Sequence, residues 1–172
     1  MRLRTAFRWV VFTGLATSLL HVITVAVLPW LVMFRVQEAA GDVWGYNRMT
    51  RVEAVDAETR FIPRPDPHMA YSVCPFDLSK GPLRVVYGAM ADHASVTAYG
   101  GDTENFLTIA GAELSPGEVV LATPEQAARL DGPATVAPGQ TGIVLVRRLV
   151  RTPDDWPEAE RERASVSCGP AL

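Results

Sequence analysis

A run of 26 residues without a charged side chain, residues 9–34, places the strongest constraint on what this chain can fold into. At a rise of about 1.5 Å per residue such a run forms a helix of about 39 Å, which exceeds the hydrocarbon thickness of a bilayer, about 30 Å. Arg2, Arg4 and Arg8 stand directly before the run. The sequence therefore predicts one membrane-spanning helix at residues 9–34.

Two other structures are compatible with an apolar N-terminal run: a cleaved secretory signal peptide and a helix buried in a protein core. The apolar part of a signal peptide covers about 7 to 15 residues. Only the sequence EAAG at residues 38–41 resembles a cleavage region. A core helix usually has a polar face, and only five polar residues lie between Val10 and Phe34. We therefore prefer a retained membrane anchor.

The charges on either side of the run predict the orientation of the chain. Three arginines precede the run, whereas Arg35, Glu38 and Asp42 follow it. Cytoplasmic flanks of membrane helices are usually the more basic ones. We expect residues 1–8 to form a cytoplasmic tail, the bilayer to surround the helix, and the rest of the chain to lie outside. In a bacterium this is the periplasmic side of the inner membrane.

His21 lies near the middle of the run, where an ionisable side chain is costly and often functional. The same run contains no Asp, Glu, Lys or Arg that would partner it. We favour a neutral imidazole that packs between helices, and the alternatives are a proton relay or a metal ligand.

The part of the chain that follows the run is acidic and contains both cysteines. After the three leading arginines are set aside, 13 basic and 19 acidic side chains remain. Nucleic acid is therefore not an expected partner, because binding to phosphates requires a basic surface. In an oxidising compartment Cys74 and Cys168 can form a disulfide, which would stabilise the fold by about 4 kcal/mol. The alternative is a small buried Cys74 and a free Cys168 thiol in a frayed tail.

From residue 51 onward, short segments with a hydrophobic period of two follow one another, separated by turn residues. We expect residues 35–50 to form a juxtamembrane connector and residues 51–172 to form one β-rich domain. The segments show no β–α–β alternation, so the pattern predicts a mainly β fold, an antiparallel β-sandwich or a jelly roll. The expected strands are 51–55, 69–76, 83–87, 94–99, 105–110, 117–122, 134–137 and 141–150.

Turn and capping residues refine this prediction. Asp77 and Gly81 are typical of a tight turn, so we expect a hairpin that joins the second and third of these strands. Thr123 and Gln126 form the pattern of a capping box, which predicts a short helix there. An acidic start and a basic end predict a second, exposed helix at residues 153–163.

Five segments of the β-rich part together resemble a known family. They are DPHMAYS at 66–72, FDLSKGP at 76–82, SVTAY at 95–99, DTENF at 102–106 and TGIVLVR at 141–147. The set resembles the family catalogued as domain of unknown function 1254 (DUF1254), in its short branch with a single membrane anchor. The resemblance implies a β-rich, often exported domain that occurs together with a companion domain of unknown function 1214 (DUF1214). Here the companion would be a separate membrane protein.

The polar residues of these segments are the candidate ligand-binding residues of the chain. They are Asp66, His68, Tyr71, Tyr99, Asp102 and Asn105. The chain has no GxSxG, no HExxH, no paired CxxC and no glycine-rich phosphate loop, so the sequence predicts neither a catalytic residue nor a cofactor. We expect a noncatalytic binding module of the cell envelope, whose ligand is a companion protein or a small apolar molecule.

The alternative is a periplasmic enzyme that acts on a small molecule through Asp66, His68 and Tyr99. General acid–base catalysis requires a histidine or a carboxylate within hydrogen-bond reach of the substrate. His68 and His93 could also bind a metal together with Asp66 or Asp102. Because residues scattered over loops are more often solvated turn residues, no metal site is predicted.

Overall fold

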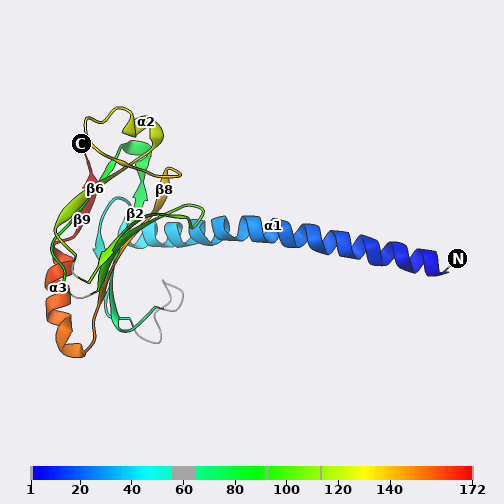
Figure 1. Ribbon diagram of the computed structural model, residues 1–172, viewed down its shortest axis with the longest axis horizontal. Helices are drawn as coiled ribbons and strands as arrows, with labels where there is room; N and C mark the ends of the chain where they lie inside the picture. The colour runs from blue at the N-terminus through cyan, green and yellow to red at the C-terminus, as the bar shows by residue number, and fades with distance from the viewer. Residues whose placement is uncertain (1, 56–64, 92, 113, 172) are drawn as a thin grey trace.

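The computed structural model describes residues 2–55, 65–91, 93–112 and 114–171. One long helix, α1 (Arg2–Trp44), projects from a β-rich body that is built from two sheets (Figure 1). Sheet A has the strand order β1-β2-β8-β4-β5, and sheet B has the order β7-β6-β3-β9. The mainly β fold that the sequence predicts is therefore confirmed, and its assignment to a jelly roll stays a prediction.

The strands match most of the predicted segments. Sheet A contains β1 (Thr50–Arg51), β2 (Met69–Asp77), β4 (Ala94–Gly100), β5 (Asn105–Gly111) and β8 (Thr141–Leu149). Sheet B contains β3 (Leu83–Tyr87), β6 (Gly117–Ala122), β7 (Thr135–Val136) and β9 (Ser167–Pro170). The pairs between these strands are antiparallel except β6–β7, which is parallel. The first predicted strand is right only at Arg51, since residues 52–55 are irregular.

The predicted hairpin between β2 and β3 is wrong, because these strands belong to different sheets. The turn signals act locally instead. The Asp77 carboxylate accepts the N–H of Ser79 at 2.8 Å and caps the short 3₁₀ helix η1 (Leu78–Lys80), and Gly81 ends it with a φ of 141°. Leu78 is fully buried, so this connection crosses from one sheet to the other over the edge of the core.

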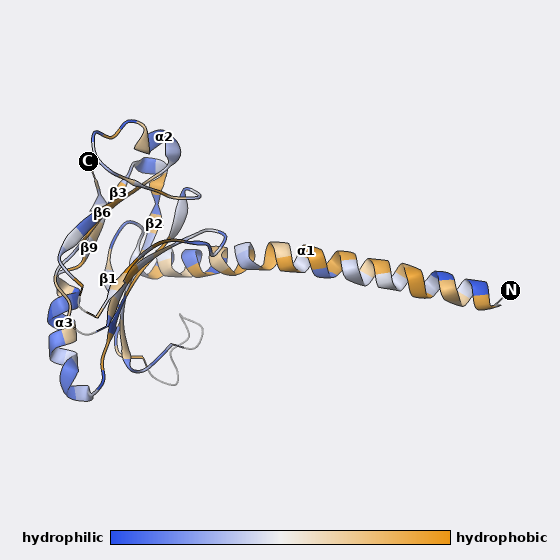
Figure 2. Cartoon of the chain, viewed as in Figure 1, coloured by the Kyte–Doolittle hydropathy of each residue, from blue (hydrophilic) through white to orange (hydrophobic). Residues whose placement is uncertain are grey.

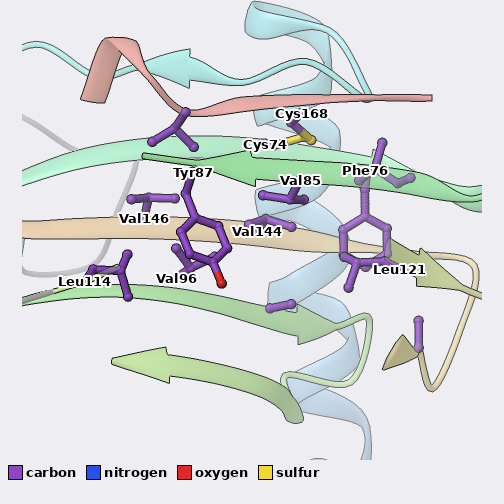
Figure 3. Packing of buried hydrophobic residues seen from close by; sticks show 14 of the residues in the cluster. Cys74, Phe76, Val85, Tyr87, Val96, Leu114, Leu121, Val144, Val146 and Cys168 are labelled. Carbon is purple, nitrogen blue, oxygen red and sulfur yellow. A yellow bond between two sulfur atoms is a disulfide. The ribbon is translucent and has the colours of Figure 1, made fainter. Parts of the chain in front are cut away.

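The hydrophobic core fills the space between the two sheets (Figure 3). Successive side chains of a strand point to opposite faces, and the inward ones here include Val144 and Val146 of β8 and Val85 of β3, all fully buried. Phe76 lies beside β8 at Gly142, where a side chain would stand 2.4 Å from the phenyl ring. Glycine at this position therefore lets the ring pack against the strand.

A disulfide between Cys74 of β2 and Cys168 of β9 joins the two sheets within this core (Figure 3). The two Cα atoms are 6.5 Å apart, and the residues are separated by 94 positions in the sequence. Sequence reasoning did not predict β9, because the short segment around Cys168 has Gly and Pro in place of alternating apolar residues. The tail that contains Cys168 is thus an edge strand beside β3, not a frayed end.

The two predicted helices of the body are present. In α2 (Pro124–Ala127) the capping box forms as expected: the N–H of Thr123 donates to Gln126 at 3.0 Å, and the N–H of Gln126 donates to the Thr123 hydroxyl at 3.3 Å. The 3₁₀ helix η2 (Pro153–Asp155) leads into α3 (Trp156–Ala164).

Helix α3 is not the exposed helix that its charges predict, because two buried arginines form hydrogen bonds between α3 and the β-rich body. Arg148 of β8 donates from Nε to the carboxylate of Glu162 at 2.7 Å. Arg163 is 1% exposed and donates to the carbonyl oxygens of Val52 and Tyr71. Burial lowers the pKa of Arg163, since desolvation disfavours the charged guanidinium. These contacts position α3 because a buried charge requires polar partners.

Helix α1 continues beyond the charge-free run and through most of the predicted connector, to Trp44. In residues 3–32 the side chains are exposed around the helix, with Pro29 half-buried, and Figure 2 shows how apolar this projecting part is. This part is long and apolar enough to cross a membrane, as an anchor or as a signal sequence. From residue 33 onward one face packs on sheet A. The buried and half-buried residues of this face are Met33, Val36, Gln37, Ala40, Gly41 and Trp44.

Candidate binding groove

An apolar groove lies between the end of α1 and the outer face of sheet A, and we call it the helix–sheet groove. One wall is a face of α1 between residues 32 and 44. The other wall consists of Val73, Tyr99, Thr103, Ile143 and Leu145. The volume of the groove is about 570 Å³, which is within the range of about 300–1,000 Å³ that is typical of small-molecule sites.

The alternation along β8 explains why an apolar surface is available outside the sandwich. Val144 points into the core between the sheets, so Ile143 and Leu145 point to the outer face. Ile143 is 8% exposed under α1, whereas Leu145 is only half-buried. On the helix wall Ala39 is small and exposed, so the side chains do not fill the space between helix and sheet at this point.

Few polar side chains reach the groove. The polar residues that line it are Tyr99 and Thr103 on the sheet wall and Arg35 on the helix wall. Arg35 lies 3.7 Å from the Glu38 carboxylate in an exposed ion pair, and such pairs contribute at most about 1 kcal/mol. Arg35 can therefore exchange this partner for another anionic group at little cost.

The structure places the residues of the proposed enzyme site at opposite ends of sheet A. The carbonyl of His68 accepts the N–H of Val150 beyond the end of β8, whereas Tyr99 pairs with Ile143 near the start of that strand. Seven residues in an extended strand correspond to about 23 Å. Asp66 and His68 are therefore far from Tyr99, and the three residues do not form one site.

Asp66 and His68 shape the turn that leads into β2. The Asp66 carboxylate accepts the His68 N–H at 2.9 Å, and His68 Nδ1 lies 3.4 Å from the same carboxylate. Both side chains are more than half exposed, as is typical of a solvated Asx-turn. Tyr71 accepts the N–H of Asp66 at 3.0 Å through its hydroxyl, and its buried ring packs in the apolar cluster beneath α1.

The other candidate residues lie at the β4–β5 end of the sheet. The Asp102 carboxylate accepts the N–H of Glu104 at 3.0 Å, and the side-chain oxygen of Asn105 accepts the hydroxyl of Thr108 at 3.1 Å. These bonds are local to the turn and its strand. Tyr99 is the member of the predicted set that lines the helix–sheet groove.

The histidines of the alternative metal site lie directly before β2 and β4, on either side of the end of β8. The carbonyl of His93 accepts the N–H of Leu149, and that of His68 accepts the N–H of the next residue. In the part of the chain that the structure describes, no group of three or more His, Cys, Asp or Glu side chains is placed to hold a metal ion.

Sequence reasoning missed the helix wall of the groove. Residues 38–41, which resemble a cleavage region, belong to α1 and contribute Ala39 and Ala40 to the groove. A signal was present in the sequence, because the residues at 33, 36, 37, 40, 41 and 44 are small, apolar or amide residues spaced by three and four. This spacing is typical of a helix with one buried face.

A second hollow, of about 400 Å³, lies on the outer face of sheet B. An ion pair of 3.5 Å between Arg84 and Glu118 stands in it, and both side chains are about half exposed. Because this surface carries solvated charges, the helix–sheet groove is the stronger candidate for an apolar ligand.

The family comparison concerns the β-rich body. Residues 46–170 match the model of the DUF1254 family, which is described as a protein of unknown function. No curated protein matches the chain.

Among solved structures, the VPA0106 protein from Vibrio parahaemolyticus is similar to 85% of the chain, with a TM-score of 0.62 and 9% sequence identity. An uncharacterised protein from Burkholderia cenocepacia is similar to 80% of the chain, with a TM-score of 0.46 and 13% identity. The chain spans only 37% and 39% of the lengths of these two proteins. At 9% identity the likeness to the Vibrio protein shows a shared fold alone.

Proposed function

The chain belongs to the DUF1254 family of proteins of unknown function, and we propose that it is a noncatalytic binding module held at a membrane by α1. The observation that carries this proposal is the helix–sheet groove. Its volume suits a small molecule, its walls are mainly aliphatic, and the polar groups that reach it are not arranged as a nucleophile with a base. Binding of an apolar group therefore fits this site better than a reaction.

Three observations support a location on the outer side of the bacterial inner membrane. The most apolar window of α1 has none of its residues buried in the protein, as a helix surrounded by lipid requires. The arginines before it favour a cytoplasmic N-terminus. The disulfide between Cys74 and Cys168 is of the kind that persists in oxidising compartments such as the periplasm.

A companion DUF1214-like membrane protein is a further proposed partner. Its contact with this chain would involve the exposed part of α1, where Gly14, Ala16, Thr17 and Ser18 offer small and hydroxyl side chains for close packing of a second helix. The groove is a separate surface, since it begins only near residue 32.

The location is tested with reporters fused after Leu172. Alkaline phosphatase, which is active only after export, should be active in this fusion, and a reporter that is active only in the cytosol should be silent. N-terminal sequencing of the purified protein should find α1 still attached. A cytosol-active fusion, or a mature N-terminus beyond Phe34, would contradict the proposed topology and anchor.

The groove is tested by photo-crosslinking in intact cells. A benzophenone amino acid replaces Val43, which lines the groove, and in a matched control it replaces Val86, which is exposed on the outer face of sheet B. We expect a covalent adduct of defined mass at position 43 and none at position 86. If neither position yields an adduct while the protein is folded and present, the groove is not a binding site.

A further inference from the structure

We infer that the occupant of the helix–sheet groove is an acyl chain of a bilayer lipid, which enters the groove from the outer surface of the membrane. The inference rests on the proposed function, because it requires α1 to span a bilayer. It names the class of ligand from three features of the groove: its continuity with the apolar run, its lining and the residues at its membrane end.

The groove is continuous with the membrane-spanning part of α1. Val32 and Met33 line it and also belong to the charge-free run, so an apolar path leads from the hydrocarbon region into the groove. Arg35 is the first charged residue after the run, which places it at the level of the lipid headgroups. A lipid of the outer leaflet thus meets the groove without crossing a charged barrier.

The β4–β5 turn brings the sheet wall to the same level. A side chain placed at Gly101 would lie 3.8 Å from the indole ring of Trp30, so this turn lies against the charge-free run itself. Tryptophan is enriched at the interface between membrane and water. The Trp30 contact therefore indicates that the end of the groove beside Thr103 faces the bilayer surface.

The lining suits an acyl chain better than it suits a polypeptide or a polar metabolite. An inserted peptide would bury backbone N–H and C=O groups, which require hydrogen-bond partners that the aliphatic walls do not supply. An acyl chain has no such groups. The polar side chains that do line the groove, Arg35, Tyr99 and Thr103, can bind a phosphate or ester oxygen of the same lipid.

The test is photolabelling of the full-length protein in nanodiscs of phosphatidylethanolamine and phosphatidylglycerol, in which a fraction of the phosphatidylglycerol has a diazirine in one acyl chain. Trypsin then releases residues 9–35, 85–129 and 130–147 as separate peptides. The first contains the membrane run, and the other two contain the residues of the sheet wall other than Val73. We expect labels in all three, and those on the sheet wall should map to residues 99–103 and 143–145.

Ala39→Trp places a large ring into the groove, and Val86→Trp places the same ring on the far face of sheet B. Ala39→Trp should reduce labelling of the sheet-wall peptides about tenfold and leave labelling of residues 9–35 unchanged, whereas Val86→Trp should change neither. Two results would overturn the acyl-chain inference and leave the proposed anchor intact. In the first, the sheet-wall peptides are still labelled in Ala39→Trp. In the second, they are not labelled in the wild-type protein although residues 9–35 are. Absence of label from residues 9–35 overturns the anchor, and the proposed function with it.

Discussion

Both faces of sheet A carry apolar side chains, but the two faces are covered in different ways. The inner face is covered by sheet B, and Val144 and Val146 on it are fully buried. The outer face is covered by the end of α1, which buries Ile143 and leaves Leu145 half-exposed beside the groove. One strand, β8, thus contributes to a closed core with one set of side chains and to the open helix–sheet groove with the other.

The difference places the stabilising contacts and the proposed binding surface on opposite faces of sheet A. The closed face is also crossed by the disulfide, so the sandwich does not need the outer contact to hold its sheets together. The outer face can therefore keep unfilled apolar space, which costs some stability but leaves room for a ligand. The predictions that follow test whether the two faces respond differently to the same change.

The largest difference is expected when a charge is placed on each face. Val144→Asp buries an unpaired carboxylate in the core and should cost about 5 kcal/mol, enough to prevent folding. Leu145→Asp, one residue later, places the carboxylate at the half-exposed groove and should cost about 1–2 kcal/mol. Circular dichroism during thermal unfolding in detergent measures both. Equal losses would show that the outer face is as closed as the inner one.

Loss of the disulfide should destabilise the protein almost as much as Val144→Asp does. Replacing Cys74 and Cys168 by alanine removes a loop closure of 94 residues and should cost about 4 kcal/mol in the chain-entropy account. Urea unfolding of the wild-type protein with and without a reductant, and without alkylation, measures the same quantity without a mutation. Labelling of the groove should be unchanged under native conditions. An unfolding midpoint that does not respond to reduction would argue that the bridge is not formed.

Much of the inner face could be predicted from the sequence, because a strand with one buried side carries a local pattern. The alternation in β3, where Leu83, Val85 and Tyr87 are buried and the residues between them exposed, is visible without a structure. The sheet to which each strand belongs could not be predicted in this way. The turn residues Asp77 and Gly81 are compatible with a hairpin or with a crossing, and only the burial of Leu78 in the core decides between them.

The packing on the outer face could not be predicted, because the helix residues that cover it are far from the strands in the sequence. Residues 33–44 pack on strands that begin more than 20 positions later. Because they lie at the end of the charge-free run, their sequence is also compatible with a linker or a cleavage region. The packing of α3 could not be predicted either. Arg163 has the position of a helix-end cation that interacts with the helix dipole, but its guanidinium is buried against backbone carbonyls of Val52 and Tyr71.

A buried ion pair at one end of the inner face should contribute to the stability of the fold. Arg148 follows Val144 and Val146 on the inner side of β8, is 1% exposed and bonds to Glu162 of α3. Glu162→Gln leaves the guanidinium without this carboxylate and should cost about 3 kcal/mol, or about 6–12 °C in the melting temperature. Glu118→Gln, which breaks the solvated pair with Arg84, should change the melting temperature little and serves as the control.

The smallest effect is expected where the structure has unfilled space. Ala39 lines the groove and is exposed, so the ring in Ala39→Trp enters the groove without displacing other atoms and should change the free energy of unfolding by no more than about 0.5 kcal/mol. Ala98 on the inner face is fully buried, and the same replacement there overpacks the core and should cost about 3 kcal/mol. Thermal unfolding of the two variants compares the faces directly. If Ala39→Trp destabilises the protein as strongly as Ala98→Trp, the outer face is closed in solution, and neither an acyl chain nor any other ligand of that size has room beside α1.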